Sequence, residues 1–269
     1  ARELYAKVPG LNIWESDGGG LQLGIRARGL SPSRTAHFNT RQNGYDISAD
    51  ALGYPETYYT PPSEALSSIQ LIRGAASLQF GPQFGGMITF KIKDPSKKNF
   101  QYNGAHTYGA YNLVNTFNMV SGTIKRRFSY LVYHQYKQGD GWRENSGFSQ
   151  QQAFGQLTYH ISDRMFLRYE QTHMNYLAQQ AGGLTDGLFE QDPRQSIRDR
   201  NWFKVDWNIS ALHYSWKIDR TATLDIKGFK VGALRQALGN LEKISRADDG
   251  QERQLISGDF DNIGGELRF

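Results

Sequence analysis

The sequence predicts an all-β membrane barrel that follows a small N-terminal α+β module. Two observations lead to this fold class. From Ser96 onward, segments of about ten residues alternate apolar and polar side chains, as strands do when one face contacts lipid and the other a lumen. Short and long polar connections alternate between these segments, as they do in an outer-membrane barrel. Before that point, a glycine-rich stretch ends at Asp94-Pro95, where we expect the compact module to close.

Composition excludes a helical membrane protein and leaves a barrel open. The 269 residues have a mean hydropathy of -0.62. They contain no apolar stretch of the roughly 18 residues that a transmembrane helix needs. Barrel strands alternate and never build such a run. Alternation by itself also fits a soluble β-sandwich whose apolar faces point to a core, and this alternative remains open.

The residue types that carry most chemistry are sparse. There is no cysteine, which excludes disulfides and thiolate metal sites, and the six histidines lack the spacing of metal ligands. We find no Gly-x-Ser-x-Gly, His-Glu-x-x-His or phosphate-loop motif, so we predict that the protein is not an enzyme and holds no cofactor. A net charge of +5, from 31 basic and 26 acidic residues, is typical of a solvated surface of mixed sign, and we expect no nucleic-acid partner.

The first elements of the chain are short. Residues 1–8 favour one or two helical turns that end at Pro9. Residues 11–14 and 21–25 favour strands. The glycine triplet at 18–20 does not have the spacing of a phosphate loop, so we interpret it as a turn between these strands.

The rest of the module combines a helix signal with two strand signals. Thr60 before Pro61 suits a helix N-cap and first helical position, which predicts a helix over residues 61–68. Residues 69–72 and 87–92 are rich in β-branched and aromatic side chains, as strands are. Earlier in the chain, Asn-Gly at positions 43 and 44 predicts a tight hairpin.

Eight strands are expected after the module. They cover residues 99–108, 112–123, 128–137, 151–160, 165–175, 202–212, 221–231 and 254–269. Long connections are expected at 139–149, 176–200 and 232–253, with short turns between the other strands. The clearest alternation places five apolar side chains on one face of its strand: Phe203, Val205, Trp207, Ile209 and Ala211.

Four pieces of sequence recur in the order of a known family. They are Val8-Pro9-Gly10-Leu11, Ile25 to Leu30 with its Arg28-Gly29 pair, Ile72-Arg73-Gly74, and Phe80-Gly81 followed by Gly85-Gly86 and an apolar strand. In this order they resemble the plug domain of TonB-dependent outer-membrane transporters. Two further stretches, 53–56 and 58–62, resemble ferric citrate receptor-like members. Residues 39–47 depart from the family, because they are more polar than the apolar strand many relatives carry there.

The resemblance implies a partial protein. Residues 1–95 correspond to the plug, without the TonB box that precedes it in relatives, and residues 96–269 to the first part of the barrel. A lumen that holds a plug belongs to barrels of about twenty-two strands, whereas eight strands enclose little more than their own side chains. We therefore expect roughly fourteen further strands outside this sequence.

The implied function is import across the outer membrane of Gram-negative cells. The cargo would be a ferric siderophore or ferric citrate-like chelate, with iron present only as part of that cargo. The implied partners are TonB with ExbB-ExbD, outer-membrane lipid and lipopolysaccharide. Two alternatives stay open: a TonB-dependent glycan or peptide importer with a surface lipoprotein, and a non-transporting scaffold or receptor that keeps the fold.

Two groups of site residues follow from the resemblance. The outward plug loops suggest five cargo contacts, because arginine grips carboxylates and tyrosine offers a flat face with a donor: Arg34, His37, Arg41, Tyr58 and Tyr59. Arg28 and Arg73 match arginines that pair with barrel glutamates in relatives, and Glu170 is the candidate partner on the polar face of a predicted strand. The alternative is that these are ordinary exposed residues.

Overall fold

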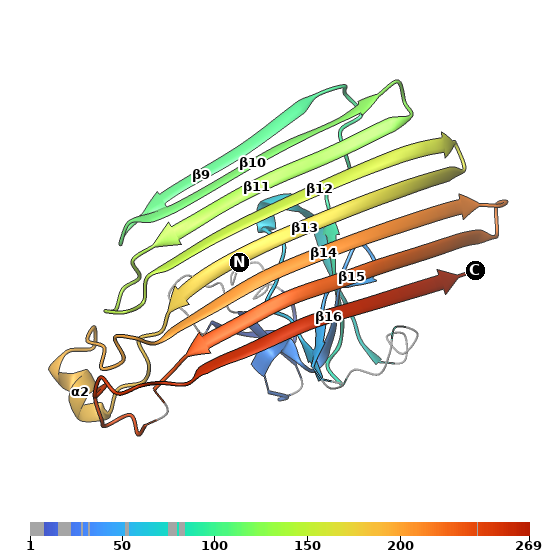
Figure 1. The fold of residues 1–269 in the computed structure, drawn as a ribbon. Helices are drawn as coiled ribbons and strands as arrows, with labels where there is room; N and C mark the ends of the chain where they lie inside the picture. The colour runs from blue at the N-terminus through green and yellow to red at the C-terminus, as the bar shows by residue number, and fades with distance from the viewer. Residues whose placement is uncertain are drawn as a thin grey trace.

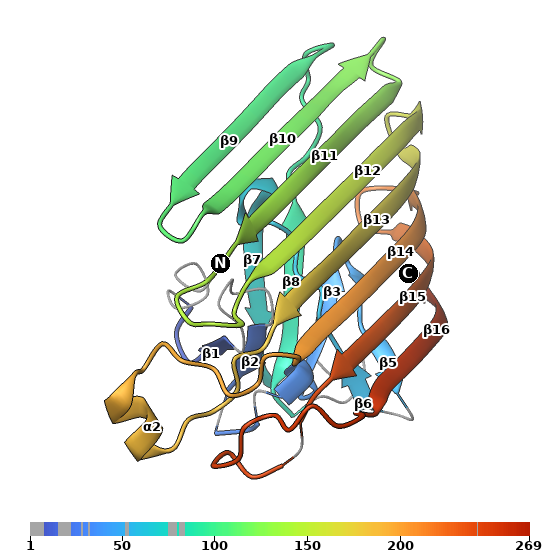
Figure 2. The ribbon, with the colours of Figure 1, turned by 60° about the vertical axis from the view of Figure 1, so that its left-hand side comes forward.

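The computed structural model describes residues 8–15, 23–27, 29–31, 33–51, 54–74, 80, 84–240 and 242–269. Eight long strands form one continuous sheet, which we call the wall, and the elements before residue 93 form a module against one of its faces (Figure 1). Figure 2 shows the wall strands curving around the module. Because the strands form a single sheet and not two facing sheets, the architecture differs from the sandwich alternative.

The wall confirms the eight predicted strands. In order they are β9 (Gln101–Gly109), β10 (Leu113–Ile124), β11 (Phe128–Gly139), β12 (Phe148–Ser162), β13 (Met165–Gln179), β14 (Trp202–Lys217), β15 (Thr223–Leu238) and β16 (Leu255–Arg268). Each pairs antiparallel with its neighbour in sequence. Most are longer than predicted, because ladder pairing continues into residues assigned to the connections, such as 176–179, which pair with 202–205 of β14.

The two ends of the wall differ. Short turns at 125–127, 163–164 and 218–222 lie at one end, which we call the turn end. The long connections 140–147, 180–201 and 239–254 lie at the other, the loop end (Figure 1). The second of these contains α2 (Asp186–Gln191). Among the described residues, no helix combines the length and the apolar character needed to cross a membrane.

The module contains three small sheets. A hairpin pairs β1 (Asn12–Glu15) with β2 (Leu23–Arg26), and a second pairs β5 (Ala49–Ala51) with β6 (Tyr54–Glu56). The third has the order β4 (Tyr45–Asp46), β3 (Phe38–Gln42), β8 (Gly86–Ile92), β7 (Leu66–Ile72), with β3 and β8 parallel. The described residues of the module also form two 3-10 turns, η1 (Ser33–Thr35) and η2 (Ser63–Ala65). The predicted boundary at residue 95 falls in the connection between β8 and β9.

Two local predictions have different outcomes. The hairpin at Asn43 and Gly44 is confirmed, with φ of 47° and 88° between β3 and β4. The helix over 61–68 is wrong, because only the short η2 forms before β7 begins at Leu66. From there the chain pairs with β8, and this pairing outweighs a helix-start signal. The predicted helical turns at residues 1–8 and the turn at 18–20 lie largely or wholly outside the described residues.

The inner face of the wall packs on the module. Phe154 and Trp207 are buried there, whereas Leu157, Tyr159 and Leu167 stand exposed on the outer face. The predicted apolar face of β14 exists, but it points inward to the module. Its outward positions near the loop end are polar instead. The module is itself well packed around apolar side chains from β2, β3 and β8.

Candidate functional site

Polar contacts join the module to the inner face of the wall in three zones. The middle zone centres on Glu170 of β13, which is 2% exposed. Its carboxylate accepts hydrogen bonds from Asn43 Nδ2 at 2.9 and 3.0 Å and from the Tyr45 hydroxyl at 2.7 Å. Next to it, Gln42 Nε2 donates to Thr172 Oγ1 at 3.2 Å. A buried carboxylate is stable here because donors from the module satisfy it.

The second zone lies toward the turn end. Arg41 of β3 is 2% exposed and forms an ion pair with Glu266 of β16. The same guanidinium donates to the Gly44 carbonyl at 2.6 Å, and Lys227 Nζ reaches that carbonyl at 3.3 Å. The Arg41 and Lys227 side chains therefore both bind the tip of the β3–β4 hairpin, and Arg41 is itself held by Glu266, more than 200 positions later in the chain.

The third zone lies toward the loop end. Arg235 of β15 pairs with Glu56 at 3.2 Å and donates to the Tyr58 hydroxyl at 3.3 Å. The Tyr58 ring contacts the rings of Phe203 and Trp207, with centroids 5.3 and 6.1 Å away. This zone combines a buried charge pair with an aromatic cluster.

A cavity of about 100 Å³ opens beside the third zone, between the module and β10 to β12. The module contributes residues 60–64 to its lining. The wall contributes five polar side chains: Asn115, Gln135, Lys137, Gln150 and Gln152. Three glutamines and an asparagine offer neutral donors and acceptors, which suits hydrogen bonding to an uncharged polar group.

Burial keeps two phenols of the module protonated. Desolvation is the largest cause that raises the pKa of Tyr45 and of Tyr59 well above its ordinary value. Nearby Glu170 raises both further. Each phenol therefore acts as a hydrogen-bond donor, Tyr45 toward Glu170 and Tyr59 toward Gln42 Oε1 at 2.7 Å.

The five predicted cargo contacts separate into different environments. Tyr58 is half-buried in the loop-end zone, and His37 is half-buried with its carbonyl accepting from the Gly85 amide at 2.8 Å. Arg34 lies in η1, and its side chain is outside the described part of the chain. The expected outward exposure of Arg41 and Tyr59 is wrong, because both are buried against the wall, at 2% and 0% exposure, and their contact with cargo stays a prediction. Packing directions, which the sequence does not encode locally, decide this.

The predicted lock residues are also placed only in part. Arg28 lies outside the described residues. Arg73 is exposed, and its guanidinium donates to the Pro9 carbonyl. Glu170 does contact the module, but through Asn43 and Tyr45. The role of Arg28 and Arg73 as partners of barrel glutamates stays a prediction.

The sequence reasoning missed Glu56, Arg235, Glu266 and Gln152. A signal existed for Glu266, because it is a charged residue in a predicted strand, whereas Arg235 was expected in the connection 232–253 and lies in β15 because that strand extends to Leu238. Their partners in the module could not be identified without the three-dimensional arrangement.

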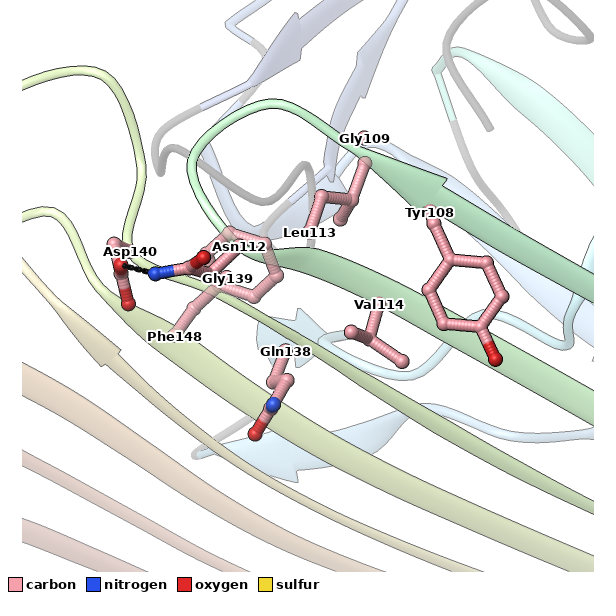
Figure 3. A pocket seen from close by; sticks show the side chains of 9 residues that line it. All are labelled: Tyr108, Gly109, Asn112, Leu113, Val114, Gln138, Gly139, Asp140 and Phe148. Carbon is pink, nitrogen blue, oxygen red and sulfur yellow. Dashed lines mark hydrogen bonds between the residues drawn. The ribbon is translucent and has the colours of Figure 1, made fainter.

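A larger hollow of about 560 Å³ lies at the loop end of β9 to β12 (Figure 3). There Asn112 Nδ2 donates to Asp140 Oδ2 at 2.5 Å, with Tyr108 and Val114 at the opposite side. The hollow borders β9, which is an edge strand of the sheet, and the module contributes none of its lining. We therefore centre the candidate site on the module–wall cavity. Within the described ranges, no group of three or more histidine or carboxylate side chains is placed to hold a metal ion.

Comparison with known proteins agrees with this architecture. Residues 1–87 match the family model of the TonB-dependent receptor plug domain. A search of curated proteins finds no match to the sequence.

Solved structures show the same fold. The chain is similar to the ferric citrate transporter FecA in its unliganded form, with a TM-score of 0.77 and 21% identity over 90% of this chain and 38% of that one. The copper transporter OprC gives 0.76 and 14% over 99% and 40%. The siderophore receptor PirA from Acinetobacter baumannii gives 0.64 and 16% over 99% and 42%. The chain spans about two-fifths of the length of these structures, and the predicted fold class is confirmed.

Proposed function

Since residues 1–87 belong to the plug-domain family of TonB-dependent receptors, we propose that the protein takes part in energised import of a ferric chelate across the outer membrane. The observation that carries this proposal is the seating of the module. Polar contacts hold it on the inner face of the wall in three zones, and a polar cavity opens between the two toward the loop end. A plug held by separable contacts, with a binding space beside it, suits gated transport.

The proposed cargo is a ferric siderophore or a ferric citrate-like chelate. The fold similarity to FecA, named as a ferric citrate transporter, supports this choice. Tyr58 in the loop-end zone has a phenol, and Lys137 in the cavity lining has a cation; both suit the oxygen-rich surface of such a chelate. The iron would remain inside its chelator, so the protein itself would need no metal ligands and no cofactor.

The proposed location and partners follow from the same premise. We place the wall in the outer membrane, with the loop end outward, in contact with lipid and lipopolysaccharide. TonB with ExbB-ExbD would supply the energy through a segment that precedes the plug in the family. Catalysis is not part of this proposal.

A second candidate function is import of a glycan or peptide with a surface lipoprotein partner. The amide side chains around the cavity favour it, because Asn and Gln bind hydroxyl and amide groups well. A lipoprotein that co-purifies stably with the full-length receptor would support this candidate.

Uptake of labelled iron tests the main proposal. A strain without the gene receives radioactive iron as ferric citrate, as a hydroxamate chelate or as a catecholate chelate, each alone. We expect uptake of at least one chelate to fall to background and to return with the wild-type gene. Removing TonB from the complemented strain should have the same effect as the deletion. Unchanged uptake of every chelate would overturn iron import, and uptake that persists without TonB would overturn energised import.

A further inference from the structure

We propose that the cavity between residues 60–64 and β10 to β12 is a cargo subsite that selects a hydrogen-bond donor, an O–H or N–H group on one arm of the cargo. This inference rests on the proposed import function and specifies the chemistry of its cargo. It does not depend on which chelator or polymer carries the arm.

The orientation of the Gln152 amide carries the argument. This side chain is 3% exposed, and its Nε2 donates to the Thr60 carbonyl at 3.3 Å. A carbonyl oxygen can only accept, so the NH₂ group of Gln152 must face Thr60 and its Oε1 must face away. Within the described part of the chain, that Oε1 is buried and has no hydrogen-bond partner. A buried acceptor left unpaired is costly, so the site is prepared for a donor from outside the protein.

The neighbouring amide side chains also direct their NH₂ groups at the protein itself. Gln135 Nε2 donates to Asn115 Oδ1 at 3.0 Å, and Asn115 Nδ2 donates to Glu64 Oε1 at 3.3 Å. Gln150 Nε2 is directed at the Met174 sulfur at 3.6 Å. The NH₂ groups around the cavity are thus directed at acceptors of the protein itself. Lys137 is the one cation among the described residues of the lining, and its ammonium can only donate. Apart from it, the lining offers a guest mainly oxygen, including the carboxylate of Glu64.

The size of the cavity limits the guest to an arm of the cargo. A volume of about 100 Å³ is well below the roughly 300–1,000 Å³ of pockets that hold a complete small ligand. A hydroxymethyl or secondary amide group fits, whereas a complete chelate does not. A carboxylate arm would find the Lys137 ammonium but would leave the Gln152 Oε1 acceptor unpaired, whereas an arm with an O–H or N–H group satisfies it, so the position beside Gln152 favours a donor.

Binding measurements on the full-length protein in detergent test this inference. The probes are ferric citrate, a ferric trihydroxamate with secondary amides, its N-methylated analogue, and the neutral polymers maltohexaose and tetraglycine. The variant Gln152→Met keeps the length of the side chain and removes the acceptor. Gln156→Met is the matched control, because Gln156 is equally buried on the same inner face of β12 and does not line the cavity.

We expect Q152M to weaken the amide-bearing trihydroxamate about tenfold, as one lost hydrogen bond implies. The N-methylated analogue should bind wild type and Q152M alike, and Q156M should match wild type for both. Gln152→Leu gives the same expectation if Q152M does not fold, as judged by thermal unfolding.

The remaining outcomes separate the two proposals. Equal chelate affinity in wild type, Q152M and Q156M would overturn the subsite and leave the import function standing. Binding of maltohexaose or tetraglycine, weakened by Q152M, with no binding of any ferric chelate, would support the subsite and overturn the ferric cargo. If no probe binds, both proposals are overturned.

Discussion

Glu170 shows how one side chain couples the module to the wall. Replacing it with leucine leaves the half-buried Asn43 amide and the buried Tyr45 hydroxyl without this acceptor. We predict that Glu170→Leu lowers the free energy of unfolding of the module by about 1–3 kcal/mol for each orphaned donor. Calorimetric unfolding in detergent measures this. Glu190→Leu, on the exposed side of α2, is the control and should change the stability little.

The Arg41–Glu266 pair gives a second prediction at this scale. Removing either partner alone leaves a charge at the interface, and we expect a loss of up to about 3 kcal/mol, moderated because Glu266 is 22% exposed. Replacing both with methionine should cost less than the sum of the single losses. A double-mutant cycle measured by thermal unfolding checks the coupling. Strictly additive losses would contradict an interaction between these two side chains.

Sequence reasoning identified residue types better than residue directions. Tyr58 and Tyr59 are adjacent and identical in chemistry, yet one is half-buried beside Arg235 and the other is fully buried against Gln42. Arg41 was expected outside because its stretch resembles an outward plug loop of the family. Its guanidinium instead pairs with Glu266 of the wall, and a contact between residues more than 200 positions apart leaves no local signal in the sequence.

At the scale of elements, the β3–β4 hairpin depends on a glycine. Gly44 has a φ of 88°, and an added Cβ would meet Lys227 Nζ. We predict that Gly44→Ala destabilises the module by about 1–2 kcal/mol, because a residue with a Cβ atom disfavours positive φ. Gly187→Ala is the matched control, since that position in α2 has open space and lies in a helix, where alanine is favoured. Equal unfolding temperatures for the two variants would contradict the prediction.

The long connections at the loop end are held together by arginines, which predicts a pH dependence. Arg200 donates to both oxygens of Asp248, at 2.8 Å from Nε and 2.5 Å from Nη2, and these bonds hold the pKa of Asp248 well below its ordinary value. A carboxyl whose folded pKa is depressed stabilises the fold fully above its unfolded pKa of about 3.9, and this contribution is lost as the pH falls toward the folded pKa.

We therefore expect connection 239–254 to resist proteolysis from pH 7 down to about pH 4 and to become sensitive below that range. Limited digestion with an acid-active protease measures this. Asp248→Asn should be sensitive already at pH 7, because the neutral amide loses the charge-assisted bonds. Glu252→Gln, an exposed position in the same connection, should behave as wild type. Sensitivity of the wild type that does not vary with pH would contradict the role of Asp248.

Elements with a strong period were predictable, and elements decided by pairing were not. The wall strands follow from alternation that extends over many residues. Residues 61–68 carry a helix-start signal, but Leu66 to Ile72 have partners in β8 that the local sequence does not reveal. For β14, the sequence predicted that apolar and polar side chains alternate. It did not predict which face points inward, because an apolar face can contact either lipid or a packed module. The structure turns Trp207 inward, where its Nε1 donates to the Ile47 carbonyl at 3.2 Å.

At the scale of the whole molecule, the fold followed from the sequence, because the order of the plug motifs and the number of strands are encoded along the chain. The relation between module and wall was not encoded in this way. It combines apolar packing on the inner face with separate polar contacts, and each polar contact involves few residues and can be broken by itself. If import requires the module to move relative to the wall, a covalent link between them should stop transport without preventing cargo binding.

A thiol cross-link in the full-length protein tests this. Glu56→Cys and Arg235→Cys replace both members of a buried pair, so neither charge is left alone, and this chain has no other cysteine. The two thiols are joined by a short bis-methanethiosulfonate, which forms a disulfide with each cysteine as a methanesulfinate leaves. The joined double variant should bind a labelled ferric chelate as well as the untreated protein and should import almost none. Each single-cysteine variant treated with the reagent should keep its own untreated rate of import. Full transport by the cross-linked protein would show that the module need not leave this part of the wall, and the path of the cargo would then lie along the inner face of β10 to β12.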